Sequence, residues 1–225
     1  MIPSRFPLSG LLVLLFSAGL AFSGEPFEGS FDILVNGTDR AQITLKGKKA
    51  KVAPPESVAA TNGYPLIDFE NMKMRLVSTK DKTWFELPLA MLEARTKSNP
   101  PKIEETGKAE SLLGLSAKEY LVSDSVSGTK IRIWASSDRS VGINFLLGFQ
   151  RQGEHGLVLA RAARILLAER GLMPLKASAS DKSGRDVFKW EVTALHPAVV
   201  AASTFEVPEG YKRVSMVAGS AQEKK

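Results

Sequence analysis

The sequence offers few side chains that could act as nucleophiles, acids or metal ligands. It contains no cysteine and only two histidines, which excludes disulfides, thiolate zinc sites, iron–sulfur clusters and cysteine nucleophiles. His155 and His196 have no second histidine at ligand spacing, so a metal site would need distant carboxylates such as Asp68 or Glu70. We therefore expect two surface or capping imidazoles, and no metal.

Two further patterns have the residue types of catalysis but the wrong geometry. Ser127 and Lys130 have the Ser-x-x-Lys spacing of serine acyltransferases, in which the serine begins a helix and the lysine lies one turn later. Here Gly128 indicates a turn into a strand, so the lysine would point away from the serine. Glu104 and Glu105 are adjacent on a predicted strand and face opposite sides of it. The sequence predicts no catalytic residue and no cofactor, with a hydrolase built on scattered carboxylates as the alternative.

Four lysines, Lys46, Lys48, Lys49 and Lys51, form the strongest local cluster of charge in a chain with 30 Lys and Arg against 24 Asp and Glu. Such a cluster suits contact with anionic headgroups. It equally suits a solvated strand end whose charges discourage edge-to-edge pairing. No aromatic residue lies among these lysines, so we expect no binding of nucleic acid.

The first 23 residues have the features of a signal peptide. Arg5 precedes an apolar run, and Ala21-Phe22-Ser23 places small residues where signal peptidase requires them. The run of about 15 residues is shorter than the roughly 20 of a membrane-spanning helix, and no later segment is apolar enough to span a bilayer. We expect cleavage near Ser23-Gly24, a periplasmic or secreted protein, one domain over residues 24–218 and a frayed polar tail over residues 219–225.

Alternation of apolar and polar residues dominates the chain after this leader, which is typical of antiparallel strands with one buried face. Asn36-Gly37 predicts a two-residue hairpin, and residues 53–63 read as a Pro- and Ala-rich loop. The predicted strands cover residues 27–35, 41–46, 66–69, 72–76, 83–87, 103–110, 115–123, 129–135, 175–180 and 186–195, with a last extended piece through Phe205, Val207 and Tyr211.

Two helices are expected among these strands, over residues 88–97 and 154–170. The second has its apolar residues on one arc at 100° per residue, and Gly171 and Pro174 end it. The order of elements predicts an α+β fold: a large curved antiparallel sheet, forming an incomplete barrel, with helices covering the concave face.

The inward positions of the strands define a candidate apolar cavity for a ligand. Its residues are Phe31, Ile43, Leu45, Met72, Met74, Ile131, Ile133, Phe188 and Trp190. Leu159, Leu166 and Leu167 of the second helix would cover this cavity, and flanking glycines such as Gly153 and Gly171 would allow the helix to move as a lid. The alternative is that these leucines and the two methionines are permanent core.

Three stretches resemble a known family of bacterial exported proteins, the domain of unknown function DUF4412. They are Glu105–Gly114 running into Ala117–Tyr120, then Gly171–Lys176, and Phe205–Tyr211. The resemblance extends from about Phe31 to Met216. Many members have a cysteine where Ser116 and Ala117 stand here, so thiol chemistry is not implied for this chain.

That family is similar in fold to the LolA-like periplasmic carriers of outer-membrane lipoproteins, in which an incomplete antiparallel barrel encloses helices and binds acyl chains. The resemblance implies the same architecture and, by analogy, a lipid or other apolar ligand. We therefore expect an exported, non-enzymatic binding protein. The alternative is an envelope protein that binds another protein through an exposed sheet edge, or a structural module with a filled core and no ligand.

Overall fold

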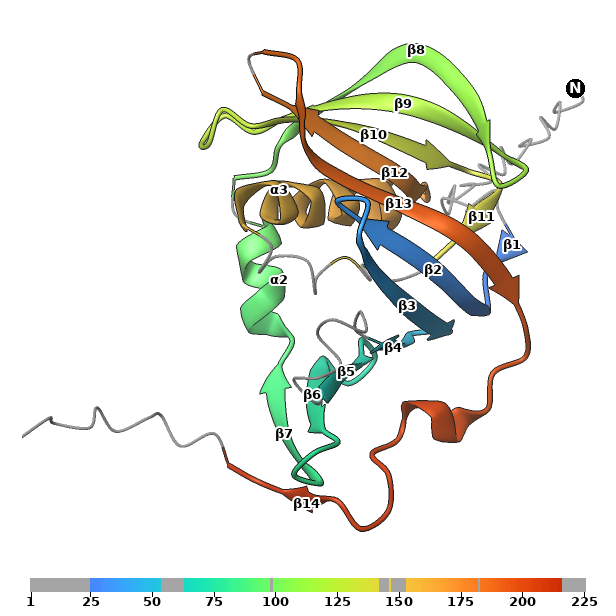
Figure 1. Ribbon diagram of the computed structural model, residues 1–225, viewed down its shortest axis with the longest axis vertical. Coiled ribbons are helices and arrows are strands. Elements are labelled where there is room, and N and C mark those ends of the chain that lie inside the picture. The colour runs from blue at the N-terminus through green and yellow to red at the C-terminus, as the bar shows by residue number, and fades with distance from the viewer. Residues whose placement is uncertain are drawn as a thin grey trace, which may run out of the picture.

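A single open sheet of twelve strands dominates the computed structural model, which describes residues 25–53, 63–97, 99–141, 146, 153–181 and 183–215. The strand order is β14-β7-β6-β5-β4-β3-β2-β13-β12-β10-β9-β8 (Figure 1). Every pairing within this sheet is antiparallel except that of β14 with β7, and β1 pairs with β11 in a small parallel sheet of their own. The expected leader and polar tail lie outside the described residues.

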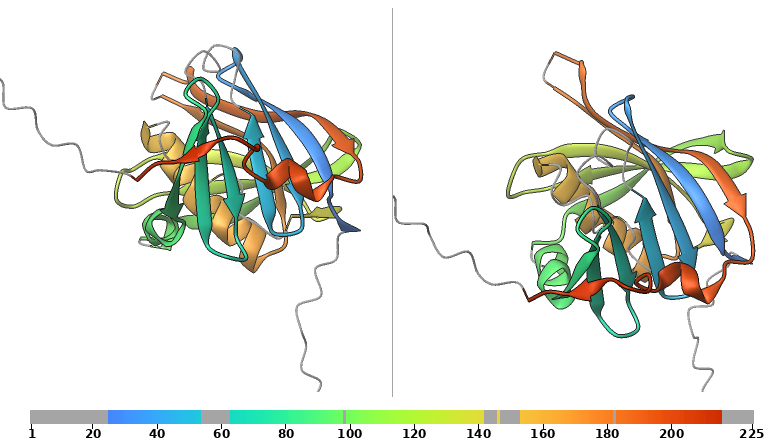
Figure 2. Two further views of the ribbon diagram at one scale, coloured as in Figure 1. Left: turned by 90° about the horizontal axis from the view of Figure 1, so that it is seen from below. Right: turned by 60° about the horizontal axis from the view of Figure 1, so that its bottom comes forward.

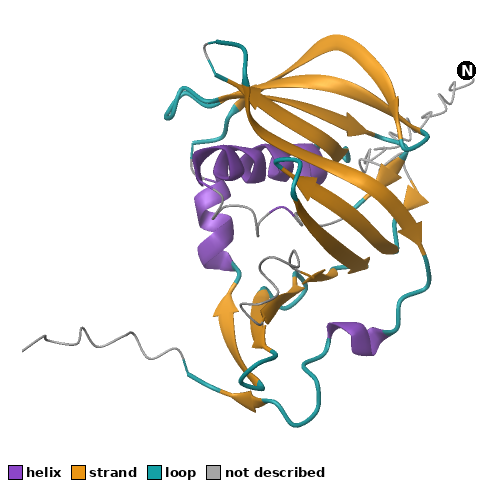
Figure 3. Cartoon of the chain, viewed as in Figure 1, coloured by secondary structure: helices purple, strands orange, loops and turns teal. Residues whose placement is uncertain are grey.

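The elements follow one another as the alternation predicts (Figure 3). The first seven strands are β1 (Glu25–Pro26), β2 (Gly29–Val35), β3 (Asp39–Lys46), β4 (Lys49–Ala53), β5 (Gly63–Asp68), β6 (Lys73–Ser78) and β7 (Thr83–Pro88). After helix α2 (Ala90–Lys97) come β8 (Lys102–Leu112), β9 (Leu115–Ser123), β10 (Lys130–Ser136) and β11 (Arg139–Ser140). Helix α3 (Gly153–Ala163) and the π-helix η2 (Arg164–Glu169) precede β12 (Met173–Ser180), β13 (Asp186–Pro197), the 3₁₀ helix η3 (Ala202–Phe205) and β14 (Lys212–Arg213).

Some strands and turns differ from the sequence predictions. The β2–β3 hairpin has a three-residue loop, because Val35 pairs with Asp39 and both Asn36 and Gly37 adopt positive φ. Lys49–Ala53 forms strand β4, although the lysines there lack the apolar alternation that would have revealed it. The last predicted extended piece contains a 3₁₀ turn at Ala202–Phe205, and only Lys212–Arg213 pairs as a strand. Most of the predicted loop 53–63 lies outside the described residues.

The register carries one apolar face across the sheet from β10 to β7. Residues that are directly paired on neighbouring strands have their side chains on the same face. One row of such residues crosses β10, β12, β13 and β2 and consists of Ile133, Ala177, Trp190 and Val35. A second row of paired residues lies at the other end of the sheet. It crosses β4, β5, β6 and β7 and consists of Ala50, Ile67, Met74 and Leu87. We call the side that bears these residues the inner face, and the opposite side the outer face.

The inner face at β10 and β12 packs against α3 and η2 (Figure 1). The predicted single helix over residues 154–170 is α-helical only to Ala163, and then widens into a π-helix in which Arg170 N–H donates to the Ile165 carbonyl. Gly171, at φ +65°, ends the helix as predicted. The broader expectation, that helices cover the concave face as a whole, stays a prediction.

Residues 198–215, which we call the C-terminal segment, cross the outer face of the sheet from β2 to β7 (Figure 2). The segment begins where Val200 N–H donates to a Glu28 carboxylate oxygen over 2.8 Å. It inserts the buried side chain of Phe205 beside β4 and ends with β14 paired on β7. The β4–β7 part of the sheet is thus supported from its outer side. Within the described residues, no helix is long and apolar enough to cross a membrane.

Candidate ligand-binding site

Seven of the nine predicted cavity residues are packed into one continuous core on the inner face. They are Phe31, Ile43, Leu45, Ile131, Ile133, Phe188 and Trp190, none more than 4% exposed. The inward assignment of every one of them is confirmed, because the polar residues that alternate with them lie on the other face. Whether this core opens to admit a ligand stays a prediction.

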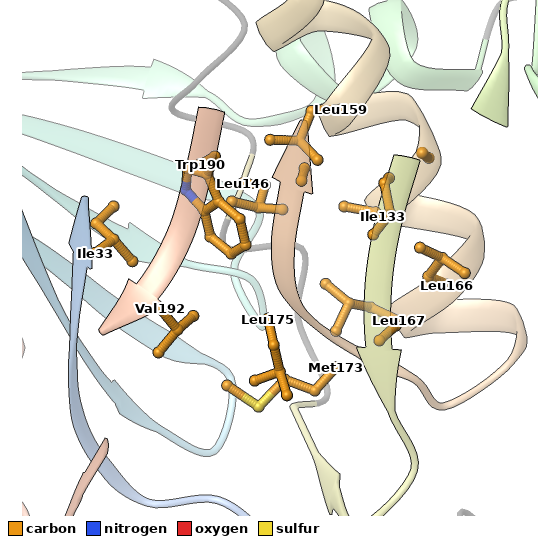
Figure 4. Close-up of a cluster of buried hydrophobic side chains, with 14 of the residues drawn as sticks. Ile33, Ile133, Leu146, Leu159, Leu166, Leu167, Met173, Leu175, Trp190 and Val192 are labelled. Carbon is orange, nitrogen blue, oxygen red and sulfur yellow. The ribbon is translucent and has the colours of Figure 1, made fainter. Parts of the chain in front are cut away.

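The three leucines of the predicted lid belong to the same core. Leu159 and Leu166 are fully buried and Leu167 is 3% exposed. Figure 4 shows them together with Ile133 of β10 and Leu146. Their contacts are apolar throughout, so the middle of the inner face is filled in this conformation.

Helix α3 is also held by a buried ion pair that the sequence did not reveal. Arg161 Nη1 lies 3.2 Å from Asp124 Oδ1, and the Asp124 side chain is only 1% exposed. Asp124 also accepts hydrogen bonds from the backbone N–H and the hydroxyl of Ser127, in the turn between β9 and β10. The serine of the Ser-x-x-Lys pattern is therefore a turn residue bonded to Asp124. No motif signals this pair, since the two residues lie 37 positions apart.

The remaining two predicted residues, Met72 and Met74, lie at a different part of the inner face. Met74 of β6 is 7% exposed, and Met72 is partly buried in the preceding turn. Beyond Met74, the row Pro65, Leu76, Phe85 crosses β5, β6 and β7. These three side chains are apolar but only partly buried.

We call Pro65, Leu76, Phe85 and the partly buried Leu87 the β5–β7 floor. The first three line a depression of about 380 Å³ that opens to solvent at the end of the strands. Gly63 forms part of its edge, where an added Cβ would lie 2.5 Å from the Val77 carbonyl oxygen. The floor therefore combines exposed apolar surface with a backbone approach that only glycine permits.

Polar groups lie along the rim of this depression. The Ser78 hydroxyl donates to Asp81 over 2.9 Å, and Tyr64 stands beside Lys51, whose ammonium lies 4.7 Å from the ring centroid. Burial raises the pKa of Tyr64 further above the ordinary tyrosine range, in which the hydroxyl is already protonated at neutral pH. The site therefore offers an apolar surface with hydroxyl groups at its margin.

The lysine cluster is spread over two strands instead of forming one patch. Lys46 ends β3, where its ammonium lies 3.2 Å from Glu28 and donates to the Val200 carbonyl. Lys49 and Lys51 belong to β4 and Lys48 to the turn before it. One of the four lysines thus fastens the C-terminal segment, and another packs on Tyr64.

The two histidines occupy separate places. His155 stacks on Phe188 at the start of α3, with ring centroids 5.8 Å apart. His196 Nε2 lies 3.0 Å from Asp32 Oδ2 on the outer face, and this contact is the main cause of the lowered pKa of Asp32. Asp68 accepts bonds from the backbone and side chain of Asn71 within its own turn. Within the described residues, no three His, Asp or Glu side chains converge as metal ligands would.

Comparison with known proteins identifies a sequence family. Residues 27–211 match the family described as a domain of unknown function, DUF4412, and no curated protein matches the sequence. Three solved structures are similar to the chain only in fold.

An uncharacterized conserved protein from Thermus thermophilus aligns with a TM-score of 0.49 at 9% identity, over 82% of this chain and 88% of that one. The Pseudomonas aeruginosa MucA/MucB complex aligns with a TM-score of 0.42 at 11% identity, over 81% of this chain and 55% of that one. A DUF1329 family protein from Desulfovibrio piger aligns with a TM-score of 0.31 at 10% identity, over 80% of this chain and 88% of that one.

Proposed function

The chain belongs to the DUF4412 family, and from this premise we propose that it is an exported, non-enzymatic binding protein that holds an apolar ligand, such as an acyl chain, on the β5–β7 floor. The observation that carries the proposal is the cluster of partly exposed apolar side chains on the inner face. A folded protein normally covers such a row. The expected export rests on the leader-like first 23 residues.

The geometry of the floor favours a ligand with a narrow apolar part. A volume of about 380 Å³ lies within the range typical of small-molecule sites, at its lower end. Each Å² of apolar surface that a ligand covers there contributes about 25 cal/mol. Met72 and Met74 lie next to the floor, and their flexible thioethers suit a ligand of variable shape.

The environments of the polar groups support binding over catalysis. The Ser127 hydroxyl donates to Asp124 and accepts the backbone N–H of Thr129, which occupies it in a turn. The paired Asp32 and His196 lie on the outer face, away from the β5–β7 floor. On the rim of the depression, the Ser78 hydroxyl donates to Asp81 within one turn, and neither histidine is among the residues that line the depression.

The alternative function is binding of another protein through the free edge of the sheet. Strand β8 is eleven residues long, is exposed along most of its length and, among the described residues, pairs with β9 alone. Lys102, Glu104 and Glu105 on this edge carry charges of both signs, which is typical of edges that avoid unwanted pairing. We therefore take the β8 edge as the second candidate for the binding surface, after the β5–β7 floor.

The experiment is a titration of the full-length mature protein with a fluorescent fatty acid. We expect saturable uptake by the wild type, about tenfold weaker uptake by Phe85→Asp, and a similar loss for Leu76→Asn, because full burial of such side chains contributes about 1.5–3 kcal/mol. Val126→Asp is the control, since Val126 is 65% exposed in the distant β9–β10 turn.

Unfolding midpoints of all variants show whether the floor variants are folded. Two results would contradict the proposal: a wild-type protein that takes up no apolar probe, or floor variants that fold and bind as tightly as Val126→Asp. The first result would favour the β8 edge as the binding surface.

A further inference from the structure

A second hollow lies on the outer face, far along the sheet from the β5–β7 floor. It has a volume of about 560 Å³ and is lined by residues of β9, β10, β12 and the β12–β13 turn. These strands are neighbours in the sheet (Figure 1). Lys130 and Arg132 of β10 line one side, and Ser178 and Ser180 of β12 line the other. Because Arg132 and Ser178 are directly opposed in register, their side chains share the outer face. We call this hollow the β10–β12 groove.

The acidic side chains around the groove are already engaged. Asp181 accepts hydrogen bonds from the backbone of Ser183 and Arg185, and its carboxylate lies 2.9 Å from the Arg185 guanidinium. Asp186 holds Lys189 at 2.8 Å and accepts the Ser180 hydroxyl. Asp181 lines the hollow and Asp186 begins β13, and the charge of each is paired with a cation of the same hairpin, Arg185 and Lys189 respectively.

Cations outnumber these acids at the groove. Arg132 lies 3.7 Å from Glu119, but the same carboxylate also lies 3.8 Å from Lys108, so one acid serves two cations. Lys130 has no acid within 4 Å in the part of the chain that the structure describes. Hydrogen bonds from Lys189 and Ser180, together with the charges of Lys189 and Arg132, lower the pKa of Asp186, which agrees with a positive local potential.

We propose that the β10–β12 groove is a binding site for a small molecule that carries a phosphate or carboxylate group. The guanidinium of Arg132 offers paired N–H donors for two oxygens of such a group, and Lys130 adds a second positive charge. The Ser178 hydroxyl, partly buried on the neighbouring strand, is placed to donate to the same anion. The volume exceeds that of a single phosphate, which leaves room for a sugar-sized remainder of the ligand.

This site is independent of the apolar ligand proposed above. The groove is on the outer face of β10 and β12, whereas the β5–β7 floor is on the inner face of three other strands. The core of Ile133 and Ala177 lies behind the groove, within the same two strands. Loss of one site therefore leaves the other in place.

The test is calorimetric titration of the full-length mature protein with three probes: inorganic phosphate, glucose 6-phosphate and glucuronate. We expect binding of at least one probe in the micromolar to millimolar range, weakened by added sodium chloride. Arg132→Ala should weaken it about tenfold and Lys130→Ala severalfold, since charge-assisted contacts are the strong ones. Lys80→Ala, in the exposed β6–β7 turn, is the matched control.

The three probes distinguish the sources of the anion. Tighter binding of glucose 6-phosphate than of glucuronate identifies a phosphate ligand, and the reverse order identifies a carboxylate. Equal binding of glucose 6-phosphate and inorganic phosphate would support the anion contacts and overturn the sugar-sized remainder. No binding of any probe at about 10 mM, or an equal loss in Lys80→Ala, would overturn the site, and unfolding midpoints confirm that the exposed-cation variants are folded.

Discussion

Arg161 and Asp124 form a buried ion pair, with side chains 11% and 1% exposed, and they join two elements that no backbone pairing joins. Asp124 belongs to the turn after β9, and Arg161 to the last turn of α3. Removing one charge of such a pair leaves the other buried without its counter-charge, which costs more than the pair itself contributes. The pair therefore specifies where α3 sits against the sheet.

We predict that Arg161→Met lowers the free energy of unfolding by about 3 kcal/mol, because Asp124 keeps its bonds from Ser127 but loses its cation. Urea unfolding measures the change. Lys118→Met is the control: Lys118 pairs with Glu105 and the two side chains are 58% and 45% exposed, so less than about 1 kcal/mol should be lost. A double variant with Asp124→Asn should lose less than the sum of the single losses, and additive losses would contradict direct coupling.

At the scale of elements, α3 with η2 is either a lid or a fixed part of the core. Leu166 is fully buried, and Arg161 holds the preceding turn to the β9–β10 hairpin. We predict that Leu166→Glu loses several kcal/mol of stability, since a carboxylate would enter a core without a polar partner. Thermal unfolding monitored by circular dichroism gives the loss.

The matched control for this helix is Glu154→Gln, an exposed change in its first turn that should leave stability within about 0.5 kcal/mol. A Leu166→Glu protein that unfolds near the wild-type temperature and takes up more fluorescent fatty acid would show instead that the helix swings away as a lid. The same measurement thus decides between the two roles that the sequence left open.

The strands were predictable from the sequence where one face is buried and the other is exposed to solvent. Gly29–Val35 alternates perfectly between buried and partly exposed positions, and the sequence shows the same alternation. β4 was missed because it has lysines at alternate positions and only Ala50 is buried, so its pairing with β3 and β5 is a tertiary effect without an apolar alternation. The π-helical widening after Ala163 has no local signature, because it depends on how η2 packs against β12.

The candidate site was only partly predictable for a related reason. Alternation identified Met74 and the other inward residues correctly, but it could not show which inward positions another element fills. α3 fills the face at β10 and β12, whereas Pro65 and Phe85 stay partly exposed. That distinction depends on the path of the chain between distant strands, so it follows from the fold and not from the local pattern.

At the scale of the whole molecule, the C-terminal segment and the β5–β7 floor lie on opposite faces of the same strands. Leu66 and Val77 point to the outer face and are buried there, while Ile67 and Leu76 point inward. Trp84 lies between Arg75 and Arg213, whose guanidinium carbons are 5.8 and 5.3 Å from its ring centroid. The segment therefore completes the outer side of these strands and reaches the edge of the depression with Val214, while Pro65, Leu76 and Phe85 on the inner side stay partly buried.

We predict that Phe205→Ala lowers the free energy of unfolding by about 3–5 kcal/mol, because the ring is 5% exposed and its removal leaves a cavity under the segment. Val199→Ala, in the same segment but 93% exposed, should change stability by less than about 0.5 kcal/mol. Chemical denaturation of both variants checks the prediction, and equal stability of the two would show that the segment is peripheral. Since the same strands carry Pro65, Leu76 and Phe85, loosening their outer side should also weaken fatty-acid uptake in Phe205→Ala, whereas Val199→Ala should bind as the wild type does.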